Sequence, residues 1–469
     1  MKKILFIVFI SLFLFVICAC DNNNNNNNNS NDDDILLPTE LDTSKETVVT
    51  FYHKMEGYNH PVGVLEDIIE SYEKDMSIKY GVKVTVELKS YSDYDDFKDE
   101  ISNGTHATVI EADSKLISSF VKDNTISLLD KYIEHSEYGL DGSEEDSYGY
   151  IDSFFYSGSI YDKKATFYSI PFNKNAEVLY YNKDLFDKYN WEVPITWDEV
   201  IEISEAWKTT TEYQTLKDTG KQVGGLGIDE EENFFINLIK QWGSEYISFN
   251  ENGDLEYRFD NSNTKAALTW LVDEFNNGNI VTSTYLDTWY CSDAFVDLQI
   301  PMAIGYSSSL AYYESLDGSF TTGVTTYPQM TRVNDVEKQV IQSGSNLSLF
   351  ECANKQEELF GWLFIKYLTS YESQLEWTTR TNFFPVRKDV IISEEFQEVL
   401  NNLLNSNSSS LLGETYQVLI NQLDYLYAVA TFDDSLSKGK FIINAILYNQ
   451  KEYDINKAIK EALNKVENS

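Results

Sequence analysis

Side chains that carry covalent or metal chemistry are scarce in this sequence. It contains four histidines and four cysteines, and beyond position 20 the cysteines are Cys291 and Cys352. It has no glycine pattern typical of a nucleophile elbow, so little in it indicates a hydrolase. His53, Glu56 and His60 have a spacing that matches no helix face and no zinc signature. These shortages favour a binding protein over an enzyme.

Basic residues are also in short supply. The chain has 36 lysines and arginines against 76 aspartates and glutamates, a formal net charge of −40. A chain this acidic is repelled by nucleic acid, and an anionic ligand would need a local group of basic side chains. Beyond the first 20 residues no run of about 18 apolar residues occurs, so we expect no transmembrane domain.

The head of the chain has an order of its own. Lys2 and Lys3 precede an apolar run from Ile4 to Ile17. This run is within the range of a signal peptide and too short to span a bilayer comfortably, so we expect residues 1–19 to be a signal peptide. The asparagine and aspartate tract that follows can bury nothing, which indicates a solvated spacer within residues 20–47.

The end of this head carries a resemblance. Ile17-Cys18-Ala19-Cys20 resembles the lipobox of bacterial lipoproteins. The resemblance implies that Cys20 receives a lipid and that the protein is anchored outside the cytoplasmic membrane, in the periplasm or at the cell surface. Cys18 is unusual in that motif, so ordinary secretion stays open as the alternative.

The remainder of the chain is large and rich in aromatic residues. About 420 residues follow the spacer, too many for one ordinary core and suited to two lobes. The chain has 32 tyrosines, 27 phenylalanines and 8 tryptophans. Such side chains usually form core, but they also stack on sugar rings in carbohydrate sites. Cys291 and Cys352 can form one disulfide or stay as two thiols, and the sequence leaves both open.

Strands and helices alternate at the start of this remainder. Hydrophobic periodicity predicts strands at 48–52, 82–88 and 108–110, with helices at 64–72 and 94–101. Parallel strands joined by helices place ligands at the carboxyl ends of the strands. The segments that follow these strands are His53 to Gly57, Ser90 to Tyr94, and Glu111 to Ser114.

A second block opens near Phe172. Val178 to Tyr181 is β-prone, and Thr196 precedes a predicted helix start with Glu199 three residues on, the pattern of a capping box. We therefore expect a second α/β region. Further helices are predicted at 264–276, 357–368 and 442–466, the last of them broken near Tyr448 to Tyr453.

One long segment carries a family resemblance. It runs from Ile170 to Phe186, ends in Tyr181-Asn182-Lys183-Asp184-Leu185-Phe186, and is followed by Pro194-Ile195-Thr196-Trp197-Asp198-Glu199. This pairing resembles the signature of the family 1 extracellular solute-binding proteins. Three further stretches fall in family order and extend the resemblance to nearly all of residues 48–469. They are Phe295 to Leu310, Ser343 to Asn346, and Phe364 to Arg387.

The resemblance implies the substrate-binding component of an ABC importer. Such a protein has the two-lobed α/β fold of the type II periplasmic binding proteins, in which lobes joined by a hinge close on a ligand and are recognised by a permease. It implies discontinuous lobes, residues 48–174 with 352–397 and residues 175–350 with 398–469. We expect a monomer without cofactor, metal or catalytic residues, whose partners are a small-molecule carbohydrate and the permease subunits.

Within the family the likeness is strongest to the glycerol-3-phosphate binders and the sugar binders near them. His53 to Gly57 and Pro171 to Asn173 both resemble the former group. The phosphate chemistry does not carry over, because Lys174-Asn175 replaces a serine pair and no arginine occurs after Arg387. Phosphate recognition usually takes bidentate arginine or a cluster of donors, although Lys174 can substitute. Glycerol-3-phosphate or a glycerophosphodiester is therefore the second ligand hypothesis.

The first site hypotheses concern polar side chains. Asp113 follows the third predicted strand, where sugar binders of this family commonly place a carboxylate that accepts hydroxyl protons; a helix N-cap is the alternative role. Glu56 stands similarly after the first strand, with a helix-dipole role as the alternative. Asn175 lies in the implied crossover between lobes, where turn formation is the alternative.

The remaining site hypotheses concern aromatic side chains and loops. The resemblance implies stacking roles for Trp242 and Trp289, with core packing as the alternative, and Phe383 stands where the family often has a ligand-contacting tyrosine. Gly344 allows close approach of backbone to ligand, with a plain turn as the alternative. The loop that touches ligand in this family aligns with Tyr306, Ser307 and Ser308.

The favoured hypothesis is a lipid-anchored binding protein that delivers a carbohydrate to an ABC permease. Two hypotheses of other classes stay open. One is a surface lipoprotein that kept the fold and acts as a sensory or adhesive module. The other is a secreted glycosidase, for which a pair among 76 carboxylates can always be nominated, so that nomination carries almost no information.

Overall fold

The structure is a computed structural model that describes most of the chain beyond residue 36. Predicted features in residues 1–36, with Cys20 among them, and the predicted ligand contact Glu56 lie outside the described residues. None of the described helices combines the length and the apolar character that a membrane span needs. The described residues are 37–38, 40–55, 61–91, 93–140, 167–249, 255–315, 318–333, 336–381, 383–406, 410–427, 429, 437–448 and 454–464.

One mixed sheet runs through residues 37–469, which form one compact unit. Its order is β2-β1-β3-β11-β4-β9-β5-β8, with β10 paired to β4 and β12 to β11, and β6 and β7 form a separate pair. The strands are β1 (Thr47–His53), β2 (Val84–Ser90), β3 (Val109–Ala112), β4 (Ile170–Asn182), β5 (Leu226–Ile228), β6 (Ile247–Phe249), β7 (Leu255–Tyr257), β8 (Ile280–Thr282), β9 (Met302–Tyr306), β10 (Thr322–Thr326), β11 (Val340–Leu349) and β12 (Leu426–Tyr427).

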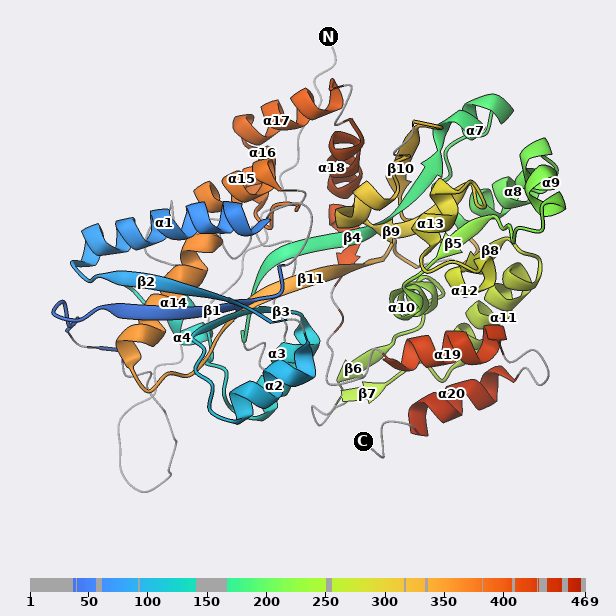
Figure 1. Ribbon diagram of the computed structural model, residues 1–469. Coiled ribbons are helices and arrows are strands. Elements are labelled where there is room, and N and C mark those ends of the chain that lie inside the picture. The colour runs from blue at the N-terminus through green and yellow to red at the C-terminus, as the bar shows by residue number, and fades with distance from the viewer. Residues whose placement is uncertain are drawn as a thin grey trace, which may run out of the picture. The chain divides into compact units, whose positions relative to one another are not determined.

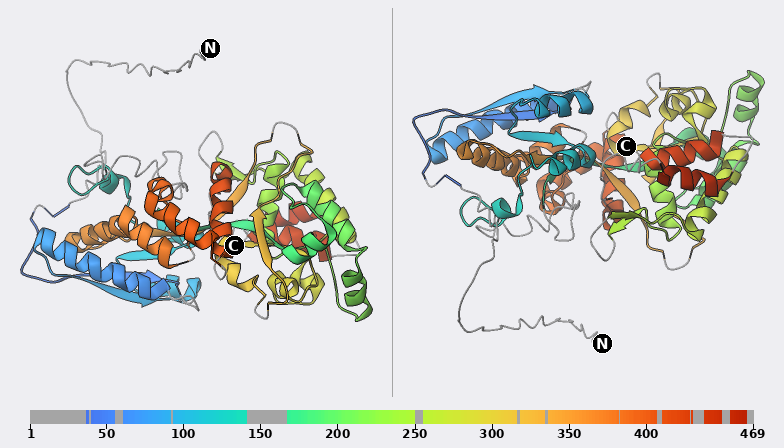
Figure 2. Two further views of the ribbon diagram at one scale, coloured as in Figure 1. Left: turned by 90° about the horizontal axis from the view of Figure 1, so that it is seen from above. Right: turned by 90° about the horizontal axis from the view of Figure 1, so that it is seen from below.

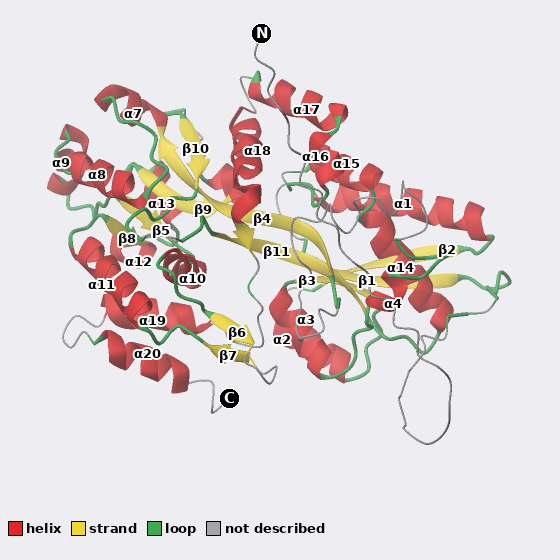
Figure 3. Ribbon diagram, turned by 180° about the vertical axis from the view of Figure 1, so that it is seen from behind, coloured by secondary structure: helices red, strands yellow, loops and turns green. Residues whose placement is uncertain are grey.

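Helices surround this sheet (Figure 3). Those in the first half of the chain are α1 (Pro61–Tyr80), α2 (Tyr94–Ser102), α3 (Ser114–Lys122), α4 (Asp130–Ile133), α7 (Lys183–Tyr189), α8 (Trp197–Trp207), α9 (Thr211–Asp218) and α10 (Glu231–Gln241). Those that follow are α11 (Ser262–Asn276), α12 (Ser283–Leu286), α13 (Cys291–Val296), η1 (Ser307–Tyr312), α14 (Lys355–Leu368), α15 (Tyr371–Arg380), α16 (Lys388–Ile392), α17 (Glu394–Leu404), α18 (Ser410–Gln422), η2 (Leu423–Tyr425), α19 (Ser437–Tyr448) and α20 (Ile455–Asn464).

The N-terminal end of the sheet confirms the predicted alternation of strands and helices. β1 pairs in parallel with both β2 and β3. Alternate residues of β1 face opposite sides: Phe51 packs against Phe364 of α14, and Tyr52 packs against Phe97 of α2. Helices α1 and α14 therefore cover one face, and α2 and α3 cover the other (Figure 1). The carboxyl ends of β1 and β3 point toward the middle of the sheet.

The C-terminal end of the sheet has the same layered arrangement. Leu179 and Tyr181 of β4 enter a core shared with α8, α10, α11, α19 and α20, whereas Val178 and Tyr180 enter a second core shared with α13 and α18. Figure 2 shows these helices grouped around their end of the sheet from above and below. The predicted capping box at Thr196 and Glu199 is present at the start of α8. This α/β architecture confirms the predicted fold class.

Strands β4 and β11 join the two ends of the sheet. β4 pairs with β11 over its first half and with β9 and β10 over its second half. The β4–β11 pairing is interrupted between Gly344 and Asn346, and Gly344 has a φ of 99°. A Cβ atom at Gly344 would lie 1.9 Å from the backbone oxygen of Asn173. Only glycine fits here, because the two backbones meet where a side chain would stand.

The lobe boundaries stay a prediction, and one packing feature bears on them. Phe384, Val390 and Phe396 lie in the same core cluster as Val178 and Tyr313. The predicted division places the first three residues in one lobe and the last two in the other. The segment that contains α16 and α17 thus packs at the junction.

The two cysteines beyond the head of the chain, Cys291 and Cys352, are both buried free thiols.

Candidate functional site

A cavity of about 720 Å³ lies where β4 and β11 cross between the two ends of the sheet. This volume is typical of small-molecule sites. Its N-terminal wall consists of Lys54, Met55, Pro61, Tyr91, Tyr94, Glu111, Ala112, Asp113 and Ser114. Its crossover wall consists of Asn173, Lys174, Asn175, Ile341, Gln342, Ser343, Gly344 and Ser345. Its C-terminal wall consists of Glu230, Glu232, Asn233, Tyr306 and Ser308, and Phe383 and Val429 complete the lining.

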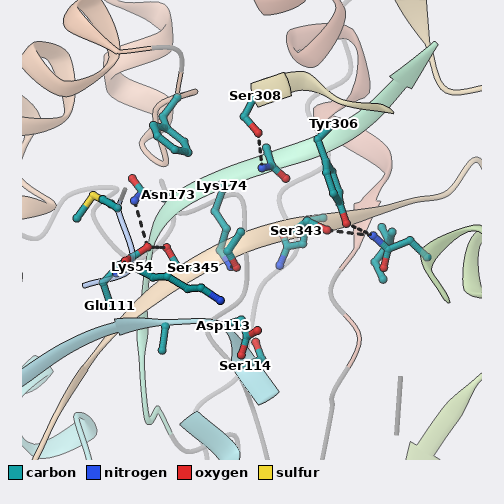
Figure 4. A pocket seen from close by; sticks show the side chains of 18 of the residues that line it. Lys54, Glu111, Asp113, Ser114, Asn173, Lys174, Tyr306, Ser308, Ser343 and Ser345 are labelled. Atoms are coloured by element: carbon teal, nitrogen blue, oxygen red, sulfur yellow. Dashed lines mark hydrogen bonds between the residues drawn. The ribbon is translucent and has the colours of Figure 1, made fainter. Parts of the chain in front are cut away.

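Glu111 is the anchor of the N-terminal wall. It lies on β3 and is 5% exposed. Its carboxylate accepts hydrogen bonds from the Lys54 backbone N–H at 3.0 Å, from the Asn173 amide at 3.3 Å and from the Ser345 hydroxyl (Figure 4). Because these donors come from the end of β1, from β4 and from β11, one carboxylate holds the N-terminal and crossover walls together.

Asp113 stands two residues further on, just past the end of β3. One of its carboxylate oxygens accepts the Leu116 backbone N–H at 2.9 Å and so caps α3. The Tyr94 hydroxyl also bonds to Asp113, and burial together with this carboxylate raises the pKa of Tyr94 well above its usual range. The ammonium of Lys54 lies 4.1 Å from the centre of the Tyr94 ring. The capping alternative is therefore present, and the same side chain also lines the cavity.

The crossover wall offers two buried acceptors that lack a donor in the part of the chain that the structure describes. The side-chain oxygens of Asn173 and Asn175 are buried and accept no hydrogen bond from the described residues. Figure 4 shows the Asn173 amide group directed at Glu111 through its nitrogen. Asn175 donates to the Ser308 hydroxyl at 2.8 Å. A buried oxygen without a donor is unfavourable, so both oxygens favour a ligand that donates hydrogen bonds.

Lys174 extends from β4 between these two asparagines. It is 4% exposed, and its ammonium donates to the Gly344 carbonyl at 3.3 Å. Burial lowers the pKa of Lys174 to about 7, against the opposing influence of Asp113 and Glu111. Near neutral pH this side chain therefore carries only part of a positive charge.

The C-terminal wall is ordered by Asn233 of α10. Its amide donates to the Tyr306 hydroxyl at 2.8 Å and to the Ser343 hydroxyl at 3.2 Å, which fixes the tyrosine at the end of β9 (Figure 4). Glu230 stands beside this group at the start of α10, and burial raises its pKa. Beneath it lies Glu177 of β4, 2% exposed, whose pKa is also raised by burial and then by Glu230. This wall is acidic and partly desolvated.

Six of the residues predicted from the sequence line this cavity, and three described ones do not. Ser307 is buried beside it, where its hydroxyl accepts the Ala176 backbone N–H at 3.4 Å. Trp242 packs against Trp270 in the core, and Trp289 is 89% exposed. The predicted residues in the lining are Asp113, Asn175, Tyr306, Ser308, Gly344 and Phe383.

Several residues that line the cavity were not among the individual site residues predicted from the sequence. Lys54, Tyr94 and Glu111 lie in the segments that follow predicted strands, so the rule that ligands bind at strand ends already pointed to them. Glu230 and Asn233 had no such signal, because they begin a helix far along the chain. Only the folded arrangement brings them to the cavity.

A possible set of metal ligands lies away from the cavity. His106, Cys352 and Glu357 place their ligand atoms within 4.8 Å of one another. The Glu357 carboxylate accepts a hydrogen bond from the Thr108 hydroxyl at 2.6 Å and contacts the His106 ring. Burial raises the pKa of the Cys352 thiol, which disfavours the thiolate that a metal requires. These groups form a hydrogen-bonded cluster, and we assign no metal to it.

Residues 67–401 match the family described as bacterial extracellular solute-binding protein, and the chain belongs to this family. A curated relative is the sn-glycerol-3-phosphate-binding periplasmic protein UgpB of Shigella flexneri, 25% identical over 227 residues. The aligned part covers 47% of this chain and 49% of the relative. The chain thus spans about half the length of the curated relatives it matches.

Solved structures of similar fold cover more of the chain. The cyclic α-maltosyl-1,6-maltose binding protein of Arthrobacter globiformis has a TM-score of 0.68 at 18% identity, covering 90% of this chain and 99% of that one. UgpB of Mycobacterium tuberculosis in complex with glycerophosphocholine has a TM-score of 0.63 at 16% identity, covering 89% and 97%. These neighbours confirm the two-lobed substrate-binding fold.

Proposed function

We propose that this protein is the substrate-binding component of an ABC importer and that it binds a carbohydrate in the cavity between the two ends of the sheet. The observation that carries this proposal is the excess of acceptors around the cavity. Glu111, Asp113, Asn173 and Asn175 all present oxygen atoms there, and the side-chain oxygens of the two asparagines have no donor among the described residues. A sugar offers many hydroxyl donors and apolar C–H faces, which match these oxygens and the rings of Tyr94 and Phe383.

The second candidate is a glycerol-3-phosphate or a glycerophosphodiester. Lys54 and Lys174 reach the cavity, and the curated relatives are glycerol-3-phosphate binders. Against a phosphate dianion stand four carboxylates in the lining, and no arginine is among the described lining residues. An anion typically needs paired cationic donors, so carbohydrate is the better match.

The remaining parts of the proposal follow from the family and the head of the chain. We propose that residues 1–19 are removed, that Cys20 is lipidated, and that the asparagine-rich spacer that follows keeps a monomeric receptor close to its permease. A tether raises the effective concentration of two partners without any new contact. The Cys20→Ser variant should leave the membrane fraction and appear in the soluble fraction; retention of that variant in membranes would contradict lipid anchoring.

The ligand class can be tested by thermal shift on residues 37–469. The panel contains mono-, di- and oligosaccharides together with sn-glycerol-3-phosphate and glycerophosphodiesters. A ligand at 100 times its dissociation constant adds about 2.7 kcal/mol to the free energy of unfolding. We expect a sugar to raise the melting temperature. A shift with the phosphates alone would replace the carbohydrate proposal by the second candidate, and no shift with any compound would reject both.

A further inference from the structure

The charges around the cavity are unevenly distributed. Four carboxylates and two lysines line it, and the ammonium groups of both lysines contact other groups of the protein. The Lys54 ammonium lies over the Tyr94 ring, and the buried Lys174 has a pKa of about 7. The lining therefore contains more carboxylates than ammonium groups. Excess negative charge in a partly desolvated site is unfavourable unless something compensates it.

The excess of carboxylates over basic side chains is greatest at the C-terminal wall. Among the described residues, no lysine or arginine forms an ion pair with Glu230 or with Glu177 behind it. The nearest basic influence is Lys440, whose ammonium lies 3.9 Å from Glu231 instead. Burial and neighbouring carboxylates raise the pKa of Glu230. Burial, and after it Glu230 and Glu177, raise the pKa of Tyr306. All three side chains thus share one negative environment.

A purely structural role explains this arrangement poorly. Acidic residues are favourable at helix N-termini, and Glu230 stands at the N-terminus of α10. Its side chain, however, makes no capping hydrogen bond, and burial, together with neighbouring carboxylates, raises its pKa. A second observation points to a ligand at the same cavity: Asn173 is 3% exposed, and its side-chain oxygen has no donor among the described residues.

We propose that the ligand carries a cationic nitrogen, and that this group binds at the C-terminal wall against Glu230 and the ring of Tyr306, while its hydroxyl groups bind Glu111, Asp113 and Asn173. This inference rests on the proposed function and narrows its ligand class. Carboxylates beside an aromatic ring are favourable partners for an ammonium group. Such a group occurs both in amino sugars and in choline-bearing glycerol phosphodiesters, so the chemistry is shared by the two ligand candidates above.

Two matched pairs of probes distinguish these sources. The first pair is the glucosamine disaccharide, which is cationic, and its di-N-acetylated form, which has the same skeleton without the charge. The second pair is glycerophosphocholine and glycerophosphoglycerol, two phosphodiesters of which only the first, the cationic member of this pair, carries a quaternary nitrogen. Titration calorimetry with residues 37–469 at pH 7 should show at least tenfold tighter binding of the cationic member in one pair. Which pair responds identifies the source of the nitrogen.

Two variants test whether the cationic nitrogen binds at the C-terminal wall. Glu230→Gln should weaken binding of the cationic member at least tenfold and leave binding of its partner without the cationic nitrogen within about twofold. Glu202→Gln, an exposed glutamate of α8, makes the same charge change away from the cavity and should alter neither. Equal or tighter binding of the members without the cationic nitrogen would overturn the inference while the carbohydrate proposal stands. The inference would also be overturned if none of the four probes bound, or if Glu230→Gln bound the cationic member as tightly as the wild-type chain does. In either case, a sugar from the wider panel that still raised the melting temperature would leave the proposed function intact.

Discussion

The N-terminal and C-terminal walls of the cavity hold their carboxylates in different ways. Glu111 and Asp113 of the N-terminal wall accept backbone N–H groups and are tied to neighbouring side chains. Glu230 of the C-terminal wall has no hydrogen-bond or ion-pair partner among the described residues, and burial raises its pKa. The first wall is a rigid set of acceptors that is complete before a ligand arrives. The second wall becomes favourable only when a ligand brings a compensating group.

This difference indicates which wall of the cavity determines ligand specificity. Preorganised acceptors at strand ends bind any ligand that donates hydrogen bonds, because their geometry is fixed by the sheet. An uncompensated carboxylate discriminates more sharply, since a ligand without the matching charge leaves it unfavourably buried. We therefore expect the N-terminal wall to supply general affinity and the C-terminal wall to select among ligands.

The largest expected effect lies at the crossover that keeps the two walls in register. Gly344→Ala should lower the free energy of unfolding by about 3 kcal/mol or more, because its Cβ would meet the Asn173 backbone and its φ of 99° is strained for alanine. Urea denaturation measures this. Gly278→Ala is the matched control, with a φ of 75° and no atom within 4 Å of its Cβ. It should cost only about 1 kcal/mol, and equal costs would contradict the close approach.

The next effect tests the preorganised wall directly. Asp113→Asn keeps a good helix N-cap but removes the charge, so stability should change little while affinity for the bound ligand falls about 10- to 100-fold. Asp93→Asn makes the same change at the N-cap of α2, outside the cavity lining, and should leave affinity unchanged. Calorimetric titration of both variants gives the comparison. If the two bind alike, Asp113 serves only as a cap.

A smaller effect concerns the lysine between the walls. Burial lowers the folded-state pKa of Lys174 to about 7, from an ordinary value near 10.5. Between these values the unfolded state binds more protons, so the free energy of unfolding should rise with pH by at most about 1.4 kcal/mol per unit.

The Lys174→Met variant should lose this part of the pH profile. We expect the wild-type chain to gain up to about 2 kcal/mol relative to the variant between pH 7 and pH 9. Urea denaturation across this range measures the difference. Parallel profiles for the two chains would mean that Lys174 keeps an ordinary pKa in the folded state.

The smallest expected effect concerns Trp289. Its side chain is 89% exposed and absent from the cavity lining, so Trp289→Ala should leave ligand affinity within about twofold. Phe383→Ala removes an aromatic ring that does line the cavity and should weaken sugar binding by about 1 kcal/mol. A large loss in the first variant would show that Trp289 contacts the ligand, as the family resemblance implied.

The sequence located the preorganised wall through a physical rule, whereas it located Tyr306 and Ser308 of the other wall through the family resemblance. Hydrophobic periodicity located β1, β2 and β3, and the rule of strand ends then led to Asp113 and to the segments that contain Lys54 and Tyr94. This worked because the geometry of parallel strands is local and regular. Trp242 and Trp289 were predicted from their residue type and from the family resemblance. A tryptophan can pack in a core or stand on a surface with the same local sequence, so only tertiary contacts separate these cases.

The sequence by itself determined the α/β class and the family, because the periodicity of apolar residues and the segment from Ile170 to Phe186 are local patterns. Only the tertiary structure decided which side chains meet. The partnership of Glu111 with Ser345 spans 234 positions, and Glu230 reaches the cavity through the placement of a whole helix. Contacts of this kind depend on how the sheet joins its two ends. The Gly344 backbone, the partial charge of Lys174 and the uncompensated acid of the C-terminal wall all result from that junction.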